Sequence, residues 1–226
     1  MDNFSDQVLK YYKDLSPKWK LPQGIELIYP FSNEGVWDMM SQFYNRFYGD
    51  EEERCILFGI NPGRLGAGMT GVPFTDPIRL EEVCGIPNDI HKRQELSSVF
   101  IYDMISKFGS AKGFYSKIYI SSICPLGFTK AGKNYNYYDS KELYESVEKK
   151  IIKAIKKQLT FNCRKDKAFS LGQGKNFKVL KNLNKKYKWF DEIVPLPHPR
   201  WVMQYKLKNK ELYLDEYIRK LSYLFE

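Results

Sequence analysis

The stretch ILFGINPGRLGAGMTGVPFTD, residues 56–76, begins as an apolar strand and continues as a loop rich in glycine and proline. Four glycines and two prolines lie between Asn61 and Pro73. Glycine permits positive φ and close backbone approach, whereas proline fixes φ and removes a hydrogen-bond donor. A loop of this composition directly after a buried strand is therefore expected to be shaped around a ligand.

The rest of the chain alternates between apolar strands and amphipathic helices. Strands are predicted at 54–60, 117–123, 167–172 and 192–197. Helices are predicted at 97–109, 174–187 and 212–225. Another begins at a capping box formed by Asp139 and Glu142 and runs to about Leu159. Two more are predicted within 1–50, and the second of these ends at Gly49. This order predicts one α/β domain over 1–226, a three-layer α/β/α fold with a central, mainly parallel four-stranded sheet. The helices of 1–50 are expected to pack on its core.

The predicted sheet places the loops that follow its strands at one edge. Ligands of such folds bind outside the carboxyl ends of the strands. The loop after the first strand carries Asn61, and the next three loops carry Asn134, Lys175 and His198. We therefore expect these four residues to surround one cleft.

The composition limits the function classes. The chain has 226 residues, 43% of them hydrophobic, which is enough for a sizeable core. Its four cysteines are far apart and form no CxxC pair, so reduced thiols are expected in place of a zinc ribbon or iron–sulfur cluster, and no cofactor or metal is predicted. Neither a signal peptide nor a run of 18 apolar residues is recognisable, so we expect a soluble, cytoplasmic monomer without a membrane partner.

Positive charge is concentrated in residues 141–188. This span holds 15 Lys and Arg against 4 Asp and Glu, whereas the whole chain has a net charge of +9. A surface that binds a polyanion through its phosphates and a merely solvated lysine-rich face both fit this charge.

Several enzyme classes are disfavoured by what the sequence lacks. Neither a GxSxG elbow nor a Walker loop is present, and the chain has only two histidines. His91 lies in the polar segment NDIHKRQ and is predicted to be exposed. His198 differs, because it ends a buried strand between two prolines.

Three ordered motifs resemble a known family. GINPG at 59–63 with TGVPF at 70–74, CPL at 124–126 with GKN at 132–134, and HP at 198–199 look like motifs of the uracil-DNA glycosylase superfamily, specifically its single-strand-selective monofunctional branch. Each motif follows its own predicted strand. The resemblance implies an α/β/α enzyme that removes uracil or a related damaged base from DNA.

The matched residues receive roles from this resemblance. Phe74 would stack on the flipped base, Gly63 would line its pocket, and Asn134 would pair with N3–H and O4 of uracil but not with cytosine. His198 would stabilise negative charge on O2 of the leaving base, and Asn61 would orient the attacking water. A core phenylalanine, two turn asparagines and a buried structural histidine are the alternative interpretations.

The sequence departs from the family pattern after Pro199. It reads HPRWVMQYK where the family continues HPSPR, so either Arg200 or Trp201 is expected to fill the gap left by the flipped base. Lys175, in GQGKN, either binds a DNA phosphate or simply follows a glycine turn. Two rival functions stay open at this point: a catalytically silent DNA-binding protein of the same fold, and a glycosylase/lyase that uses a lysine Schiff base.

Overall fold

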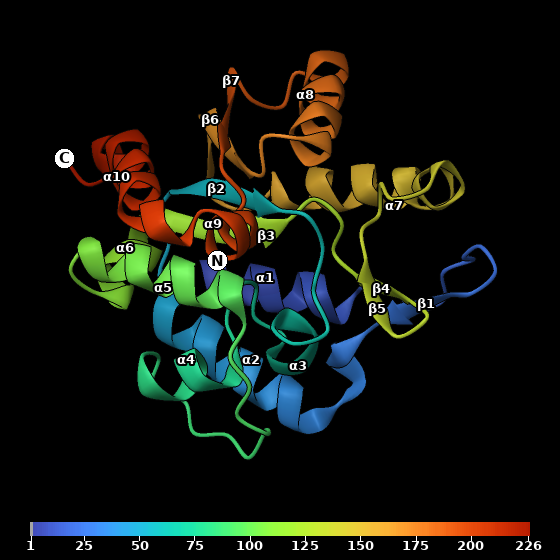
Figure 1. Cartoon of the computed structure of the whole chain (residues 1–226), viewed down its shortest axis with the longest axis horizontal. Coiled ribbons are helices and arrows are strands. Elements are labelled where there is room, and N and C mark those ends of the chain that lie inside the picture. The colour runs from blue at the N-terminus through green and yellow to red at the C-terminus, as the bar shows by residue number, and fades with distance from the viewer. Residues whose placement is uncertain (1) are drawn as a thin grey trace.

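A computed structural model describes residues 2–226 and has a parallel four-stranded sheet at its centre (Figure 1). The strands are β2 (Arg54–Gly59), β3 (Ile118–Ser122), β6 (Cys163–Leu171) and β7 (Glu192–Leu196), in the order β3-β2-β6-β7. All neighbouring pairs are parallel. The predicted α/β class and all four strands are confirmed, although β6 begins four residues earlier than expected.

The predicted helices lie on both sides of this sheet, with α8 beside β6 and β7 and with α1 and α2 below β2 and β3 in Figure 1. They are α1 (Phe4–Lys13), α2 (Glu34–Tyr48), α5 (Leu96–Lys107), α7 (Lys141–Gln158), α8 (Lys175–Tyr187) and α10 (Lys210–Leu221). The capping box predicted for α7 is wrong in its first residue. Ser140 is the N-cap and accepts from the N–H of Leu143, whereas Asp139 accepts from the N–H of Asn136.

A second, antiparallel sheet was not predicted. It has the order β1-β4-β5 and consists of β1 (Ile25–Ile28), β4 (Gly127–Lys130) and β5 (Lys133–Tyr135). The segment 124–136, expected to be a loop, thus forms a hairpin that presents Asn134. This hairpin packs tightly on the glycine-rich loop, because a Cβ atom at Gly127 would lie 2.1 Å from the carbonyl oxygen of Pro62.

Short helices complete the chain and were also not predicted. These are α3 (Ala67–Thr70), α4 (Pro77–Glu82), α6 (Ala111–Lys117) and α9 (Pro199–Tyr205), with 3₁₀ turns at η1 (Pro30–Ser32), η2 (Leu207–Asn209) and η3 (Ser222–Leu224). The single turn of α3 interrupts the glycine-rich loop. Helix α9 begins directly after His198 and so belongs to the same edge of the sheet as the predicted cleft.

Arg54 anchors the start of β2 inside the core and is 0% exposed. Its guanidinium donates to the carboxylate of Asp50 (2.7 and 3.0 Å) and to the carbonyl of Tyr115 (2.7 Å). The rings of Phe4 and Tyr48 lie 4.6 and 4.9 Å from its central carbon. Burial of this charge is thus matched by an ion pair, hydrogen bonds and cation–π contacts.

The thiols are free, and His91 lies at the surface, as the sequence predicted. All four cysteines are also buried. Between residues 2 and 226 no helix has the length and apolar character needed to cross a membrane.

Candidate active site

A cavity of about 650 Å³ opens at the carboxyl edge of the parallel sheet. Seven of the eight residues predicted for the site line it: Asn61, Gly63, Phe74, Asn134, His198, Arg200 and Trp201. The eighth, Lys175, lies in an adjoining hollow of about 280 Å³ that shares His198 and Trp201 with the cavity. The structure therefore brings together the residues that the predicted topology placed at one edge.

Phe74 forms one wall and is held in a conformation that is rare for phenylalanine. Its φ is +55°, in the left-handed region, and its side chain is half-buried. The ring fits because Gly59, the last residue of β2, has no side chain. A Cβ atom there would lie 2.6 Å from Cε2 and 2.9 Å from Cζ of Phe74. The strained backbone and the glycine together place an aromatic face in the cavity.

Asn134 is presented by β5 opposite the glycine-rich loop. Its Oδ1 accepts from the backbone N–H of Arg64 (3.0 Å), whereas its Nδ2 has no hydrogen-bond partner among residues 2–226. The backbone donor therefore fixes the amide with its NH₂ group free to donate. Asn134 is exposed, so this NH₂ group is open to solvent in the free protein.

Asn61 is tied to the segment that follows the hairpin. Its Oδ1 accepts from the N–H of Tyr137 (3.2 Å), and its Nδ2 donates to the carbonyls of Pro62 (3.3 Å) and Tyr135 (3.4 Å). This geometry gives Asn61 the structural role that the sequence left open as an alternative. One lone pair of Oδ1 is left over, because a carbonyl oxygen accepts two hydrogen bonds.

His198 is the N-cap of α9, where its Nδ1 accepts from the N–H of Arg200 (3.2 Å). This bond requires the proton of the neutral imidazole to be on Nε2, which has no partner within the described residues. Burial of the ring, with a smaller contribution from the positive charge of Arg200, lowers the pKa of His198 to about 4. The ring centroid lies 6.3 Å from that of Phe74. The cavity thus contains a neutral imidazole with a free N–H beside an aromatic face.

Two buried residues that the sequence did not single out hold these loops together. The hydroxyl of Tyr137 donates to Oδ1 of Asn176 (2.9 Å), and Nδ2 of Asn176 donates to the carbonyl of Gly59 (3.4 Å). Asn176 is 2% exposed. Its position two residues after the glycines of GQGKN was the available signal, because a polar residue there can bond the adjacent loop.

Five other polar or aromatic residues that line the cavity were also not predicted: Ser122, Gln94, Glu95, Gln204 and Tyr205. Glu95 caps α5 by accepting from the N–H of Ser98, and burial raises the pKa of its carboxyl group. Tyr205 follows Trp201 by one helical turn and is 71% exposed. In the part of the chain that the structure describes, no three His, Cys, Asp or Glu side chains are grouped to hold a metal ion.

Comparison with known proteins identifies the family of this chain. A model of the uracil DNA glycosylase superfamily matches residues 47–222. The chain belongs to the uracil-DNA glycosylase superfamily. It is also similar to a crystal structure of wild-type SMUG2 from Pedobacter heparinus, with 48% sequence identity, a TM-score of 0.96 and coverage of 99% of both chains. No curated protein matches the sequence.

Membership of the uracil-DNA glycosylase superfamily confirms the resemblance that the three motifs predicted. The matched region contains all eight predicted site residues. It also contains both sheets apart from β1, so the antiparallel hairpin that carries Asn134 belongs to the part of the chain that the family model covers.

Proposed function

We propose that this protein is a monofunctional DNA glycosylase that flips uracil or a related damaged base out of DNA and hydrolyses its N-glycosidic bond. The product would be an intact strand with an abasic site, as in base excision repair. One observation carries the proposal: the cavity combines an aromatic face, a free amide N–H and a neutral imidazole N–H. Membership of the superfamily and the similarity to SMUG2 support it.

Base recognition in this proposal begins with stacking. Phe74 covers the flipped ring and replaces stacking worth about 1–3 kcal/mol. Nδ2 of Asn134 donates to O4 of uracil, and its Oδ1 accepts from N3–H with the lone pair that Arg64 leaves free. Cytosine presents a donor at position 4 and an acceptor at N3, so it would leave both groups unpaired. Gly63 leaves room for the ring beside this amide.

Bond cleavage then depends on His198. Water attacks C1′ of the sugar as the bond from C1′ to N1 breaks and its electron pair departs with the base. The water loses a proton to solvent, and the departing base takes one up from solvent at N1. The Nε2–H of His198 donates to O2 as negative charge spreads over the departing ring. Asn61 holds the water with its remaining lone pair. An amide cannot take a proton from that water, so the rate is expected to be modest.

Contact with the strand is assigned to α9 and to Lys175. Trp201, 40% exposed, and Arg200 lie on the first turn of α9, at the mouth of the cavity. Either can enter the gap in the stack, and Tyr205 one turn later extends the same surface. Lys175 lies in the adjoining hollow and would bind a phosphate next to the lesion.

The test incubates the protein with a uracil-containing oligonucleotide and measures the free uracil released. One portion of the product is treated with alkali to cleave the strand at abasic sites, and a parallel reaction contains borohydride to trap a Schiff base. We expect scission only after alkali and no trapped adduct. Lys133 is the one lysine that lines the cavity among residues 2–226, and it is exposed. A trapped adduct that disappears in Lys133→Gln would establish the lyase, and binding without excision of any uracil or oxidised pyrimidine would establish the silent DNA-binding protein.

A further inference from the structure

Most of the basic span 141–188 lies away from the cavity. Lys175 is its only cation that lines either hollow within the described part of the chain. Helices α7 and α8 run back from the carboxyl edge of the sheet and end at Gln158 and Tyr187, shortly before β6 and β7 begin. Since α8 has 13 residues, its end lies roughly 20 Å from Lys175. The positive charge at these helix ends therefore has no role in the site described above.

The two helix ends meet at one aromatic ring. Nζ of Lys156, from α7, lies 5.1 Å from the ring centroid of Tyr187, and Nζ of Lys186, from α8, lies 5.2 Å from it. The two ammonium groups are thus at most about 10 Å apart. Trp189 stacks on the ring of Tyr187, with 4.9 Å between the ring centroids and an interplanar angle of 10°. Cation–π contacts with the stacked ring of Tyr187 hold the two ammonium groups in place.

These lysines belong to a larger cationic surface, the α7–α8 basic end, which comprises Lys153, Lys156, Lys157, Lys185, Lys186, Tyr187 and Lys188. All six lysines are exposed, and none forms an ion pair within residues 2–226. Few carboxylates lie nearby, and two of them already have partners. Glu148 accepts from the hydroxyl of Tyr144, Glu192 pairs with Lys167, and Asp191 is exposed. Even with the exposed carboxylate of Asp191 counted against its six lysines, the α7–α8 basic end keeps a large net positive charge.

We propose that the α7–α8 basic end binds the phosphate backbone of a second segment of DNA, separate from the segment whose base enters the cavity. This inference rests on the proposed action on DNA. A run of phosphates supplies negative charges at close, regular intervals, and its binding is driven by release of counterions without dependence on base sequence. Because the two surfaces lie at opposite edges of the sheet, one molecule can hold two segments and pass between them while searching.

The experiment first saturates the cavity with a short single-stranded oligonucleotide that carries a non-cleavable uracil analogue. A labelled, uracil-free duplex is then titrated in, and its affinity is measured at several salt concentrations. We expect the wild-type protein to bind this second DNA. Lys156→Gln combined with Lys186→Gln should weaken that binding about tenfold and reduce the slope of log K against log salt by about 2.

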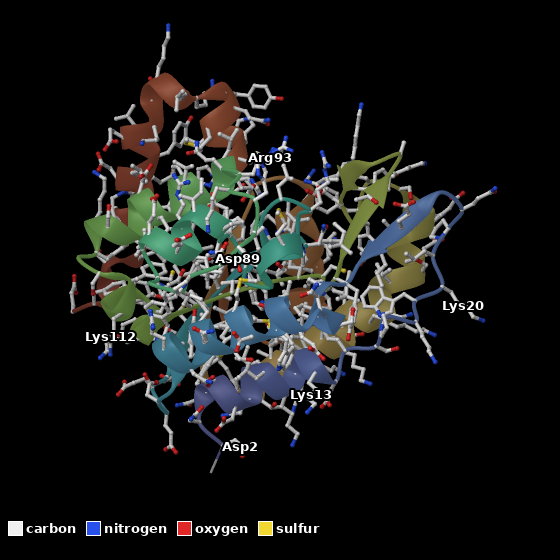
Figure 2. The ribbon with its side chains drawn as sticks, turned by 90° about the horizontal axis from the view of Figure 1, so that it is seen from below. Asp2, Lys13, Lys20, Asp89, Arg93 and Lys112 are labelled. Carbon is white, nitrogen blue, oxygen red and sulfur yellow. The ribbon has the colours of Figure 1, made fainter. Side chains whose placement is uncertain are left out.

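A matched control removes two other unpaired positive charges, Lys13→Gln with Lys112→Gln, and should leave the second affinity unchanged. Figure 2 shows Lys13 and Lys112 at the surface of α1 and α6. The inference is overturned if no second duplex binds, if the control loses as much affinity as the Lys156 and Lys186 variant, or if polyglutamate competes as well as DNA. Single-turnover excision of a short uracil oligonucleotide should stay within about twofold in both variants. Were that excision absent from the wild type while the duplex result held, the proposed function would fail and this inference would stand.

Discussion

Oδ1 of Asn134 accepts a 3.0 Å hydrogen bond from the backbone N–H of Arg64, which joins β5 to the glycine-rich loop. A backbone N–H can only donate, so this bond decides which end of the amide is the oxygen. The NH₂ group is left free in the cavity. The recognition proposed for uracil thus depends on a contact between two segments that are 70 residues apart in the chain.

Asn134→Asp tests this arrangement. The carboxylate keeps the bond from Arg64 but loses the donor to O4 and repels that oxygen, so single-turnover excision of uracil should fall by at least about 10²-fold. Its protonated form complements cytosine, so preference for uracil over cytosine should also shrink. Asn182→Asp, which adds the same charge on the exposed side of α8, is the control. An unchanged uracil preference would show that another residue reads the base.

A second prediction concerns Gly59 and Phe74. Gly59→Ala would place a methyl group 2.6 Å from the ring, which must move out of the stacking position. We expect each of Gly59→Ala and Phe74→Ala to weaken binding of a non-cleavable uracil analogue by about 1–3 kcal/mol. In the double variant the costs should not add, because the methyl group has no ring to displace. Additive costs would mean that Gly59 acts through the neighbouring strand instead.

The sequence predicted the parallel sheet well because its strands are continuous apolar runs that alternate with helices. The hairpin of β4 and β5 was missed for a physical reason. Its strands are four and three residues long, contain glycine and lysine, and gain stability by pairing with β1, about 100 residues earlier. Local pattern does not reveal such a distant partner.

The site was also predicted only in part: local motifs identified its residues but not the contacts between them. Motifs singled out Phe74, Asn134 and His198, and the structure places all three at one cavity, although Asn134 lies on β5 and not in a loop. The contacts that hold the side chains of the site were not predicted: Gly59 leaves room for the ring of Phe74, and the N–H of Tyr137 binds Oδ1 of Asn61. These are tertiary contacts, so the bonds of the Asn61 amide to Tyr135 and Tyr137 were visible only in the structure.

Arg54 provides a prediction about stability that is independent of the cavity. Arg54→Met keeps much of the side-chain volume but leaves the carbonyl of Tyr115 buried without its donor and removes the ion pair with Asp50. The free energy of unfolding should fall by about 3–5 kcal/mol, measured by urea titration. Excision per folded molecule at low temperature should be unchanged, because Arg54 lies at the opposite end of β2 from Phe74. A loss below about 1 kcal/mol would show that methionine packing replaces the ion pair.

The protonation of His198 is expected to make both excision and stability depend on pH. Its pKa of about 4 in the folded protein lies below the value of about 6.5 in the unfolded chain, so the folded state keeps the imidazole neutral as the pH falls. Two consequences follow, over different pH ranges. Single-turnover excision should stay nearly constant from pH 8 to about pH 5 and decline only as the pH approaches 4. The contribution of His198 to stability, in contrast, should decrease as the pH falls from about 6.5 towards 4, because only the unfolded chain takes up the proton.

His198→Ala should separate these effects. It removes the N–H that we propose stabilises the leaving base, so the single-turnover rate at pH 7 should fall by about 10²–10³-fold while binding of the uracil analogue falls much less. The variant should also lose less of its melting temperature than the wild type between pH 7 and pH 5, since alanine has no proton to gain. His91→Ala, at the exposed histidine, is the matched control and should leave the rate unchanged. If wild-type excision instead fell tenfold between pH 7 and pH 6, the imidazole would be charged in that range, and its role as a neutral donor to O2 would have to be abandoned.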